Sequence, residues 1–363
     1  MGETTDSGTE KTVLVTGCST GIGRATALQF RDADWEVYAS ARDPEEIADL
    51  RERGCRTMEL DVTDDLEAVA AIDRIYEEQG RLDCLVNDAG YDQFGPVEDV
   101  PMERVIEQFD VNTFGPLRLV RAALARMRRQ GRDTVVNVTA GIGGFTFPGI
   151  GVYNASKRAL ETATDVLRQE VADEDVEVVA VQPGFVVTDF YDRALAEIDR
   201  LDHSPAYADL YRVLDRIGIV EGGGPGINSP ERVARTILTA ATAERPDALY
   251  RVGTLPDLLT YLGMVVRGRV RDRVTKLGVA ALSSDLAQRL LDRLETRQAK
   301  RRSEVQNGQR TRRRWDEEGR QDEEERGIGA DRTVESRRLR SARRVRPATR
   351  GARSCAARSA ARR

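Results

Sequence analysis

The chain has 363 residues, 40% of them hydrophobic, which is ample for a large buried core. Residues 1–296 carry 34 Lys and Arg against 51 Asp and Glu, a net charge of −17, whereas residues 297–363 carry 22 against 10, a net charge of +12. No apolar run approaches the ~20 residues of a membrane span, and the single histidine, His203, argues against zinc sites and histidine-based triads.

Cysteine and lysine usage bears on the cellular setting. The four cysteines have neither metal-ligand nor disulfide spacing, so we expect a reduced, cytoplasmic protein without a metal site. Residues 1–10 are polar and acidic, which predicts a flexible N-terminus rather than a signal peptide. An acidic chain with only four lysines fits a halophilic protein, because salt screens its self-repulsion; a genome that favours Arg codons is the alternative.

Strand and helix signals alternate along residues 11–254. The expected strands are residues 12–16, 36–40, 56–60, 83–87, 134–139, 176–182 and 248–252. The expected helices are residues 22–31, 44–53, 66–78, 102–130, 152–172 and 230–243. Most strands are rich in Val and Leu without clean alternation, as strands buried on both faces are. This order predicts an α/β fold, a doubly wound parallel sheet that binds ligands beyond the carboxyl ends of its strands.

The remaining segments allow more than one interpretation. Residues 189–218 are helical in pattern and act either as a lid over a substrate or as a plain connecting pair of helices. Residues 255–296 predict an amphipathic helical extension that packs on the domain or touches a membrane surface or a partner subunit. Residues 297–363 predict a disordered basic tail, either solvated without specific function or able to bind nucleic acid.

A glycine loop, T-G-C-S-T-G-I-G (residues 16–23), follows the first strand and opens the first helix. Glycines at Gly17, Gly21 and Gly23 let the backbone approach a pyrophosphate, and the helix N-terminus supplies amide N–H groups and the positive end of its dipole. The loop therefore predicts dinucleotide binding, although its spacing differs from the commoner G-x-G-x-x-G.

Tyr153 and Lys157 stand four residues apart in an expected helix and so share one face. A free tyrosine titrates near pKa ~10, and a close ammonium group lowers that pKa by about 1–3 units. The pair then acts as a general acid/base that exchanges a proton with an alcohol. Alone, this spacing is common in ordinary amphipathic helices, so the interpretation depends on the glycine loop upstream.

Together these motifs resemble the short-chain dehydrogenase/reductase family, whose hallmarks are T-G-x-x-x-G-I-G near the start and Y-x-x-x-K in the second half. The resemblance covers roughly residues 11–266 and implies a single Rossmann-type domain. Further matches in order are L-D-V (60–62), N-D-A-G (87–90), V-N (111–112) and P-G-F-V-V-T (183–188). Phrases such as F-G-P (94–96) and P-E-R-V-A (230–234) resemble the branch with the 17-beta-hydroxysteroid and retinol dehydrogenases.

The resemblance implies a role for each matching residue. Tyr153 is the acid/base, Lys157 lowers its pKa and holds the nicotinamide ribose, and Asn112 completes a proton relay through water. The implied cofactor-binding residues are Gly17, Ser19, Thr20, Gly21, Ile22, Gly23, Arg42, Asp61, Val62, Asn87, Ala89, Gly90, Tyr153, Lys157, Pro183, Gly184, Val186 and Thr188.

Two positions depart from the family pattern. Asp88 replaces the second Asn of the usual N-N-A-G. Ala140 stands thirteen residues before Tyr153, where the family places a Ser that hydrogen-bonds the substrate oxygen. Thr139 is adjacent, but neighbouring residues on a strand point to opposite faces. Either Thr139 shifts inward as a catalytic residue, or another group substitutes, or the enzyme is slow.

The end of the second strand bears on cofactor choice. An NAD site requires a carboxylate there for the ribose hydroxyls, and this chain has Ala41 followed by Arg42. An arginine can form a forked pair with a 2′-phosphate, so we expect NADP(H) rather than NAD(H), with Asp43 as an objection.

The first hypothesis is an NADP(H)-dependent oxidoreductase that acts on an apolar alcohol or ketone. The second is a catalytically weak NADP(H)-binding sensor or scaffold, which Ala140 favours. The third is a nucleic-acid or membrane binder that works through its tail and merely retains the fold. The resemblance also implies a homodimer or homotetramer, with no specific nucleic-acid partner.

Overall fold

The computed structural model describes residues 10–140, 147–186, 188, 190–217, 228–253 and 268–283, all within the first of two compact units, Met1–Asp292. The expected tail and most of the expected 255–296 extension lie outside the described residues. The strands are β1 (Thr12–Val15), β2 (Glu36–Ala41), β3 (Arg56–Glu59), β4 (Cys84–Asn87), β5 (Asp133–Val138), β6 (Val176–Pro183) and β7 (Leu249–Val252).

Helices connect these strands. They are α1 (Gly21–Arg31), α2 (Ala48–Glu52), α3 (Asp65–Gln79), α4 (Met102–Phe109), α5 (Gly115–Gln130), α6 (Gly151–Glu170), α7 (Phe190–Ile198), α8 (Ala208–Ile217), α9 (Pro230–Thr242) and α11 (Arg269–Leu282). Two short 3₁₀ turns, η1 (Pro44–Ile47) and η4 (Pro205–Tyr207), and one π-turn, η2 (Asp110–Phe114), complete the helical elements described.

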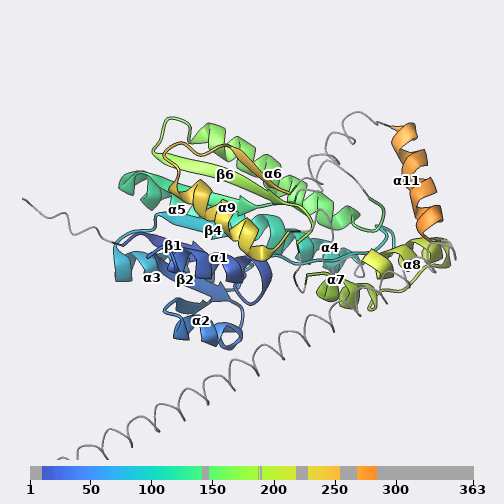
Figure 1. Ribbon diagram of the computed structural model, residues 1–363, viewed down its shortest axis with the longest axis horizontal. Helices are drawn as coiled ribbons and strands as arrows, with labels where there is room; N and C mark the ends of the chain where they lie inside the picture. Colours follow the sequence, from blue (N-terminus) through green and yellow to red (C-terminus); the bar gives the residue numbers. More distant parts are fainter. Residues whose placement is uncertain are drawn as a thin grey trace, which may run out of the picture. The chain divides into compact units, whose positions relative to one another are not determined.

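The seven strands form one parallel sheet in the order β3-β2-β1-β4-β5-β6-β7 (Figure 1). The chain starts in the middle at β1, winds outward to β3, and returns to β4 on the other side of β1. The strand order therefore reverses between β1 and β4, which is where doubly wound sheets open a crevice for a ligand. The expected α/β fold of Rossmann type is confirmed.

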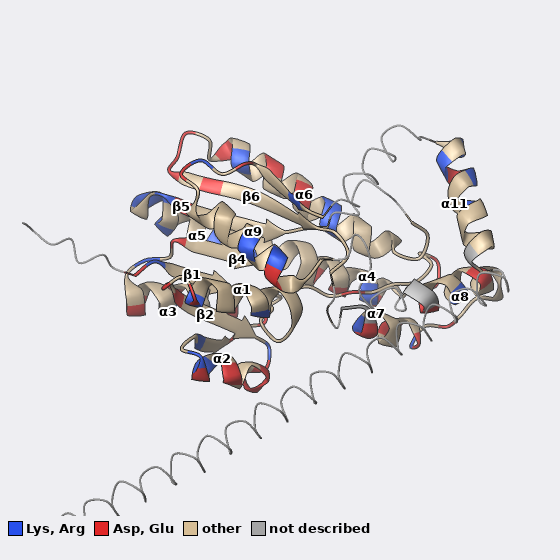
Figure 2. Ribbon diagram, viewed as in Figure 1, with Lys and Arg blue, Asp and Glu red and all other residues tan. Residues whose placement is uncertain are grey.

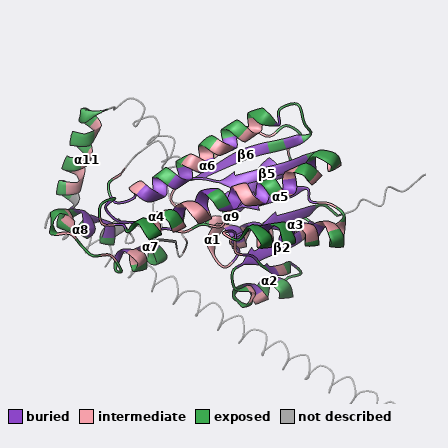
Figure 3. Ribbon diagram, turned by 180° about the vertical axis from the view of Figure 1, so that it is seen from behind, coloured by how far each residue is buried: buried purple, intermediate pink, exposed green. Residues whose placement is uncertain are grey.

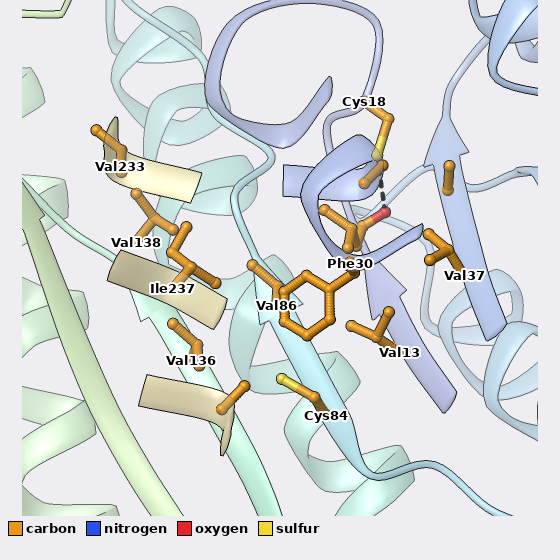
Figure 4. Packing of buried hydrophobic residues seen from close by; sticks show 14 of the residues in the cluster. Val13, Cys18, Phe30, Val37, Cys84, Val86, Val136, Val138, Val233 and Ile237 are labelled. Carbon is orange, nitrogen blue, oxygen red and sulfur yellow. Dashed lines mark hydrogen bonds between the residues drawn. The ribbon is translucent and has the colours of Figure 1, made fainter. Parts of the chain in front are cut away.

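Two apolar clusters hold the layers together. On one face of the sheet, α1 and α9 pack over β1, β4 and β5, with the Phe30 ring among Val13, Val86 and Cys84 (Figure 4). On the other face, α3 and α5 pack over the same strands around Leu14 and Leu85. Because both faces are covered, the central strands β1, β4 and β5 are buried along their whole length, whereas the edge strands β3 and β7 are partly exposed (Figure 3). Charged residues lie mainly on the outer helices and loops (Figure 2).

The predicted helix over 102–130 is wrong in one respect, because the π-turn η2 separates α4 from α5 at Asn112. The Asn112 side chain fixes this turn: its Oδ1 accepts the Tyr91 N–H at 2.8 Å, and its Nδ2 donates to the Tyr91 carbonyl at 2.9 Å and to Ser156 Oγ at 3.1 Å. Such π-turns interrupt the backbone hydrogen-bond ladder and occur often at functional sites.

Candidate active site

A cleft of about 730 Å³ opens at the carboxyl ends of the strands. It is lined by the glycine loop after β1, by residues 88–92 after β4, by residues 138–140 at the end of β5, and by residues 183–186 after β6. The first two segments flank the crevice between β1 and β4. Its position is therefore the one that the strand order dictates.

The glycine loop is shaped by close backbone packing. Gly17 has φ +74°, and a Cβ there would lie 2.8 Å from Ala89 Cα. A Cβ at Gly23 would lie 2.4 Å from the Gly17 carbonyl oxygen. Any larger residue at these two positions would displace the backbone, so the loop can lie against the 88–90 segment only with glycine. Gly23 thus supports the cleft from behind, and it is not part of the lining.

Tyr153 and Lys157 both line the cleft from α6, as their spacing predicts, and each is 7% exposed. Lys157 Nζ donates to the Val138 carbonyl at 3.1 Å, which holds the ammonium at the end of β5. Burial lowers the pKa of Lys157, while the nearby Asp88 and Asp92 carboxylates oppose that change. The Tyr153 ring packs edge-on against Phe94, with 5.7 Å between centroids.

Two predicted site residues use their side chains to build the scaffold. Asn87 lies beneath the cleft, where its Nδ2 donates to Asn137 Oδ1 at 2.8 Å and so links β4 to β5. Asn112 holds the π-turn to Tyr91 and Ser156 and does not line the cleft. The structure thus brings the other predicted residues together at the cleft and places Gly23, Asn87 and Asn112 behind them.

Ala140, which stands where the family has a serine, lies at the end of β5. Thr139 and Ala140 both line the cleft, but the Thr139 hydroxyl donates to the Val181 carbonyl of β6 at 3.3 Å. That hydroxyl proton is engaged with the sheet in this conformation. The Ala140 methyl packs in an apolar cluster with Phe94 and Tyr153 and has no hydrogen bond to offer.

The end of β2 presents a cation to the cleft. Arg42 lines it with an exposed side chain, and no partner is found for this guanidinium among the described residues. Ala41 beside it is buried. Asp43 caps η1 instead, because its Oδ1 accepts the Glu45 N–H at 2.9 Å. Glu46 also lines this end of the cleft.

Sequence reasoning missed a group of residues that form a further wall of the cleft. Apolar side chains form most of that wall, with one arginine and one buried carboxylate among them. They are Phe94, Phe147, Ile150, Phe185 and Val213, together with Arg193 and Asp92. Arg193 comes from α7 and Val213 from α8, so residues 189–218 contribute to the wall of the cleft, as the lid interpretation requires. No spacing signal marks Asp92, because its burial depends on elements far away in the sequence.

Asp92 is buried and Asp88 is half-buried, and both carboxyl groups lie close enough to Lys157 for their charges to interact. Burial raises the pKa of each to about 7, and the Lys157 ammonium opposes that rise. The Gly23 N–H also stabilises the Asp88 carboxylate.

No group of three or more metal-binding side chains is found in the described part of the chain. No helix in that part is long and apolar enough to span a bilayer.

Comparisons with known sequences agree with this arrangement. The short chain dehydrogenase family model matches residues 11–198. The Escherichia coli "Uncharacterized oxidoreductase YbbO" is 29% identical over 73% of this chain and 94% of its own length. The 3-ketodihydrosphingosine reductase of Bacteroides thetaiotaomicron is 31% identical over 68% and 89%. The NADPH-dependent 3-dehydrocapnine reductase of Ornithobacterium rhinotracheale is 30% identical over 72% and 94%.

Solved structures show the same fold. A short-chain dehydrogenase from Streptomyces avermitilis is 29% identical, with a TM-score of 0.63 over 76% of this chain and 99% of that one. A short chain dehydrogenase/reductase from Burkholderia phymatum in complex with NAD is 25% identical, with a TM-score of 0.58 over 66% and 88%. The chain therefore belongs to the short-chain dehydrogenase/reductase family and is an NAD(P)-dependent oxidoreductase.

Proposed function

We propose that the protein is an NADP(H)-dependent oxidoreductase that interconverts an apolar secondary or primary alcohol and its carbonyl compound, with Tyr153 as the acid/base. The observation that carries the proposal is one continuous cleft. It is lined by the glycine loop, by Tyr153 and Lys157, and by apolar side chains that include Phe94, Ile150 and Phe185. A dinucleotide and an apolar substrate would meet beside the phenol.

The residues present fit a dinucleotide. The backbone of Gly17 lies in a cradle that a Cβ would fill, and the N-terminus of α1 follows it without a side-chain hydrogen bond from its N-cap residue Thr20. The pyrophosphate would lie at this loop, with Ser19, Thr20, Gly21 and Ile22 around it. Asp61 and Val62 would hold the adenine. The nicotinamide end would lie against Ala89, Gly90, Pro183, Gly184, Val186 and Thr188.

The chemistry needs a hydride and a proton. When bound, NADPH supplies the hydride that adds to the carbonyl carbon, as the C=O electron pair moves onto oxygen. Tyr153 gives the proton to that oxygen, and Lys157 favours the phenolate that remains because its positive charge lies on the same helix face. The Asn112 turn would complete the path by which water returns a proton to Tyr153.

Arg42 supports the preference for NADP(H). Its guanidinium is exposed at the cleft and can form a forked pair with a 2′-phosphate. The Asp43 carboxylate, which would oppose a 2′-phosphate nearby, is instead occupied in capping η1. The relative from Ornithobacterium is by name NADPH-dependent.

The proposal is tested by steady-state turnover with NADPH and with NADH on a panel of ketones that differ in apolar chain length. We expect turnover with NADPH, a higher kcat/KM for NADPH than for NADH, and a kcat/KM that rises with apolar size. Tight NADPH binding without turnover on any member would favour the second candidate, a weakly catalytic sensor or scaffold. The observation behind that candidate is Ala140, which leaves the substrate oxygen without the usual serine.

A further inference from the structure

If the proposed function holds, the substrate oxygen gains negative charge during reduction and needs hydrogen-bond donors around it. Tyr153 is one donor. The Ala140 methyl cannot be a second, and the Thr139 hydroxyl donates to the Val181 carbonyl at 3.3 Å. The cleft must therefore offer another donor if the enzyme is to work at an ordinary rate.

The segment after β4 passes along the reacting end of the cleft. A Cβ on Gly90 would lie 3.9 Å from Lys157 Nζ, and the Phe94 ring packs on Tyr153 at 5.7 Å. Asp92 lies between Gly90 and Phe94 in the sequence and lines the same cleft. Asp92 thus lines the same cleft as Tyr153 and lies close enough to Lys157 for the two charges to interact.

The Asp92 carboxyl has no role in holding the fold that the described residues reveal. It is 5% exposed, and its Oδ1 has no hydrogen-bond partner within the part of the chain that the structure describes. A buried polar atom without a hydrogen-bond partner destabilises the fold. A group that lines a ligand cleft and bears that cost is a candidate for contact with the ligand.

We propose that Asp92, in its protonated form, donates a hydrogen bond to the substrate oxygen and so takes the place that a serine at position 140 would hold. The Asp92 proton stays on Asp92 throughout. Tyr153 still supplies the proton that is transferred, so the balance of the reaction is unchanged.

The charged groups that face Asp92 decide when it holds its proton. Lys157 of α6 and Arg193 of α7 favour the carboxylate, and Asp88 at the end of β4 disfavours it. Burial is the largest effect and raises the pKa of Asp92 to about 7. The donor form is therefore present below pH 7 and is lost as pH rises through that value. Reduction should be fastest on the acidic side.

The test is a rescue experiment at saturating NADPH. Ketone kcat/KM is measured from pH 5.5 to 9 for wild type, Asp92→Ala, Asp92→Asn, Ala140→Ser and the Asp92→Ala/Ala140→Ser double variant. We expect Asp92→Ala to lose on the order of 10²-fold at pH 6, as the loss of one such donor does in other enzymes. In the Asp92→Ala background, Ala140→Ser should raise kcat/KM at least about tenfold. In the wild-type background, the same substitution should change kcat/KM little. Asp92→Asn keeps a donor and should have a flat pH profile.

Two controls separate this role from a structural one. Asp88→Asn should keep the fall in kcat/KM but move it to a lower pH, because the repulsion that favours the protonated form of Asp92 is lost. Glu77→Gln on the exposed side of α3 should change nothing. A readout without turnover is the infrared C=O band of protonated carboxyl groups. Asp88 and Asp92 should each contribute a band that titrates near pH 7 in wild type, and the Asp92 band is the one that Asp92→Asn loses and Asp88→Asn keeps. NADPH affinity and circular dichroism verify that each variant is folded.

The inference is overturned if Asp92→Ala stays within about twofold of wild type, or if Ala140→Ser helps the Asp92→Ala variant no more than it helps wild type. Turnover that is insensitive to Asp92 would overturn this inference alone. Absence of turnover by the wild-type protein would overturn the proposed function, and this inference with it.

Discussion

Asp88 is a negative charge beneath the loop that would hold a pyrophosphate. A Cβ on Gly23 would lie 2.9 Å from Asp88 Oδ2, so the carboxylate lies against the start of α1. The positive end of the α1 dipole would then be shared between Asp88 and the ligand phosphates. Since burial raises the pKa of Asp88 to about 7, the carboxyl is neutral in part of the molecules at neutral pH.

Cofactor affinity should therefore depend on the Asp88 charge. We predict that NADPH binding weakens as pH rises from 6 to 8.5, because Asp88 loses its proton through that range. Asp88→Asn should bind more tightly at pH 8.5, by about threefold to tenfold, and should lose the pH dependence. Fluorescence titration with NADPH at both pH values measures this. If NADPH affinity changes equally with pH in wild type and in Asp88→Asn, the Asp88 charge does not affect binding of the phosphates.

Arg42 should determine the choice between the two cofactors. Arg42→Asp removes the partner of the 2′-phosphate and supplies an acceptor for ribose hydroxyls, so the ratio of kcat/KM for NADPH over NADH should fall by at least about tenfold. Arg53→Asp, an exposed residue outside the cleft lining, is the matched control. An unchanged ratio would mean that Arg42 is only a solvated surface residue.

Residues that act through short motifs could be predicted from the sequence, and residues that act through burial could not. The Tyr153–Lys157 pair follows from helix geometry alone. The engagement of Thr139 with Val181, and the burial of Asp92, depend on how β6, α6 and α7 pack around the cleft. No local pattern encodes that packing.

At the scale of elements, the seven strands were predicted to within about two residues, because a parallel sheet buried on both faces gives short, strongly apolar runs. The π-turn at Asn112 was not predicted. Its cause is a set of side-chain bonds to Tyr91 and Ser156, which are distant in sequence. Helix α11 lies in the expected 255–296 extension and leaves Val270, Val274 and Leu277 exposed.

The amino ends of β4 and β5 bring two carboxylates together. Asp83 accepts the Thr12 N–H at 2.8 Å, and Asp133, which is fully buried, accepts from Gln130 Nε2 at 2.6 Å. Burial, with a smaller contribution from Asp83, raises the pKa of Asp133 to about 8. The unfolded chain loses this proton near its ordinary pKa, so the free energy of unfolding should fall as pH rises from about 4 to 8.

Asp133→Asn removes this charge. We predict that it raises the free energy of unfolding at pH 8 by about 1–3 kcal/mol and has a much smaller effect at pH 4.5. Urea unfolding at the two pH values measures the difference, with Asp173→Asn at an exposed position as the control. Destabilisation at pH 8 would mean that the carboxylate is charged and stabilised by its surroundings.

For the whole molecule, the charge of −17 on residues 1–296 is the dominant electrostatic feature. Salt at molar concentration shortens the screening length to about 3 Å, so self-repulsion should fade. We predict that Tm rises by at least about 5 °C between 0.15 M and 2 M KCl, and that glycerol or sucrose at matched viscosity gives a smaller rise. A Tm independent of KCl would favour codon bias as the origin of the arginine-rich composition. The expected homo-oligomer is measured in the same buffers by light scattering.

Catalysis in the cleft should depend on the Tyr153 hydroxyl. The most direct measurement compares Tyr153→Phe with Tyr76→Phe, since Tyr76 lies outside the cleft lining and its hydroxyl is buried without a hydrogen-bond partner among the described residues. Ketone turnover and NADPH affinity are measured for both. We predict that Tyr153→Phe loses at least about 10²-fold in kcat/KM while NADPH affinity stays within about threefold, and that Tyr76→Phe changes neither. Turnover by Tyr153→Phe within about tenfold of wild type would contradict this prediction.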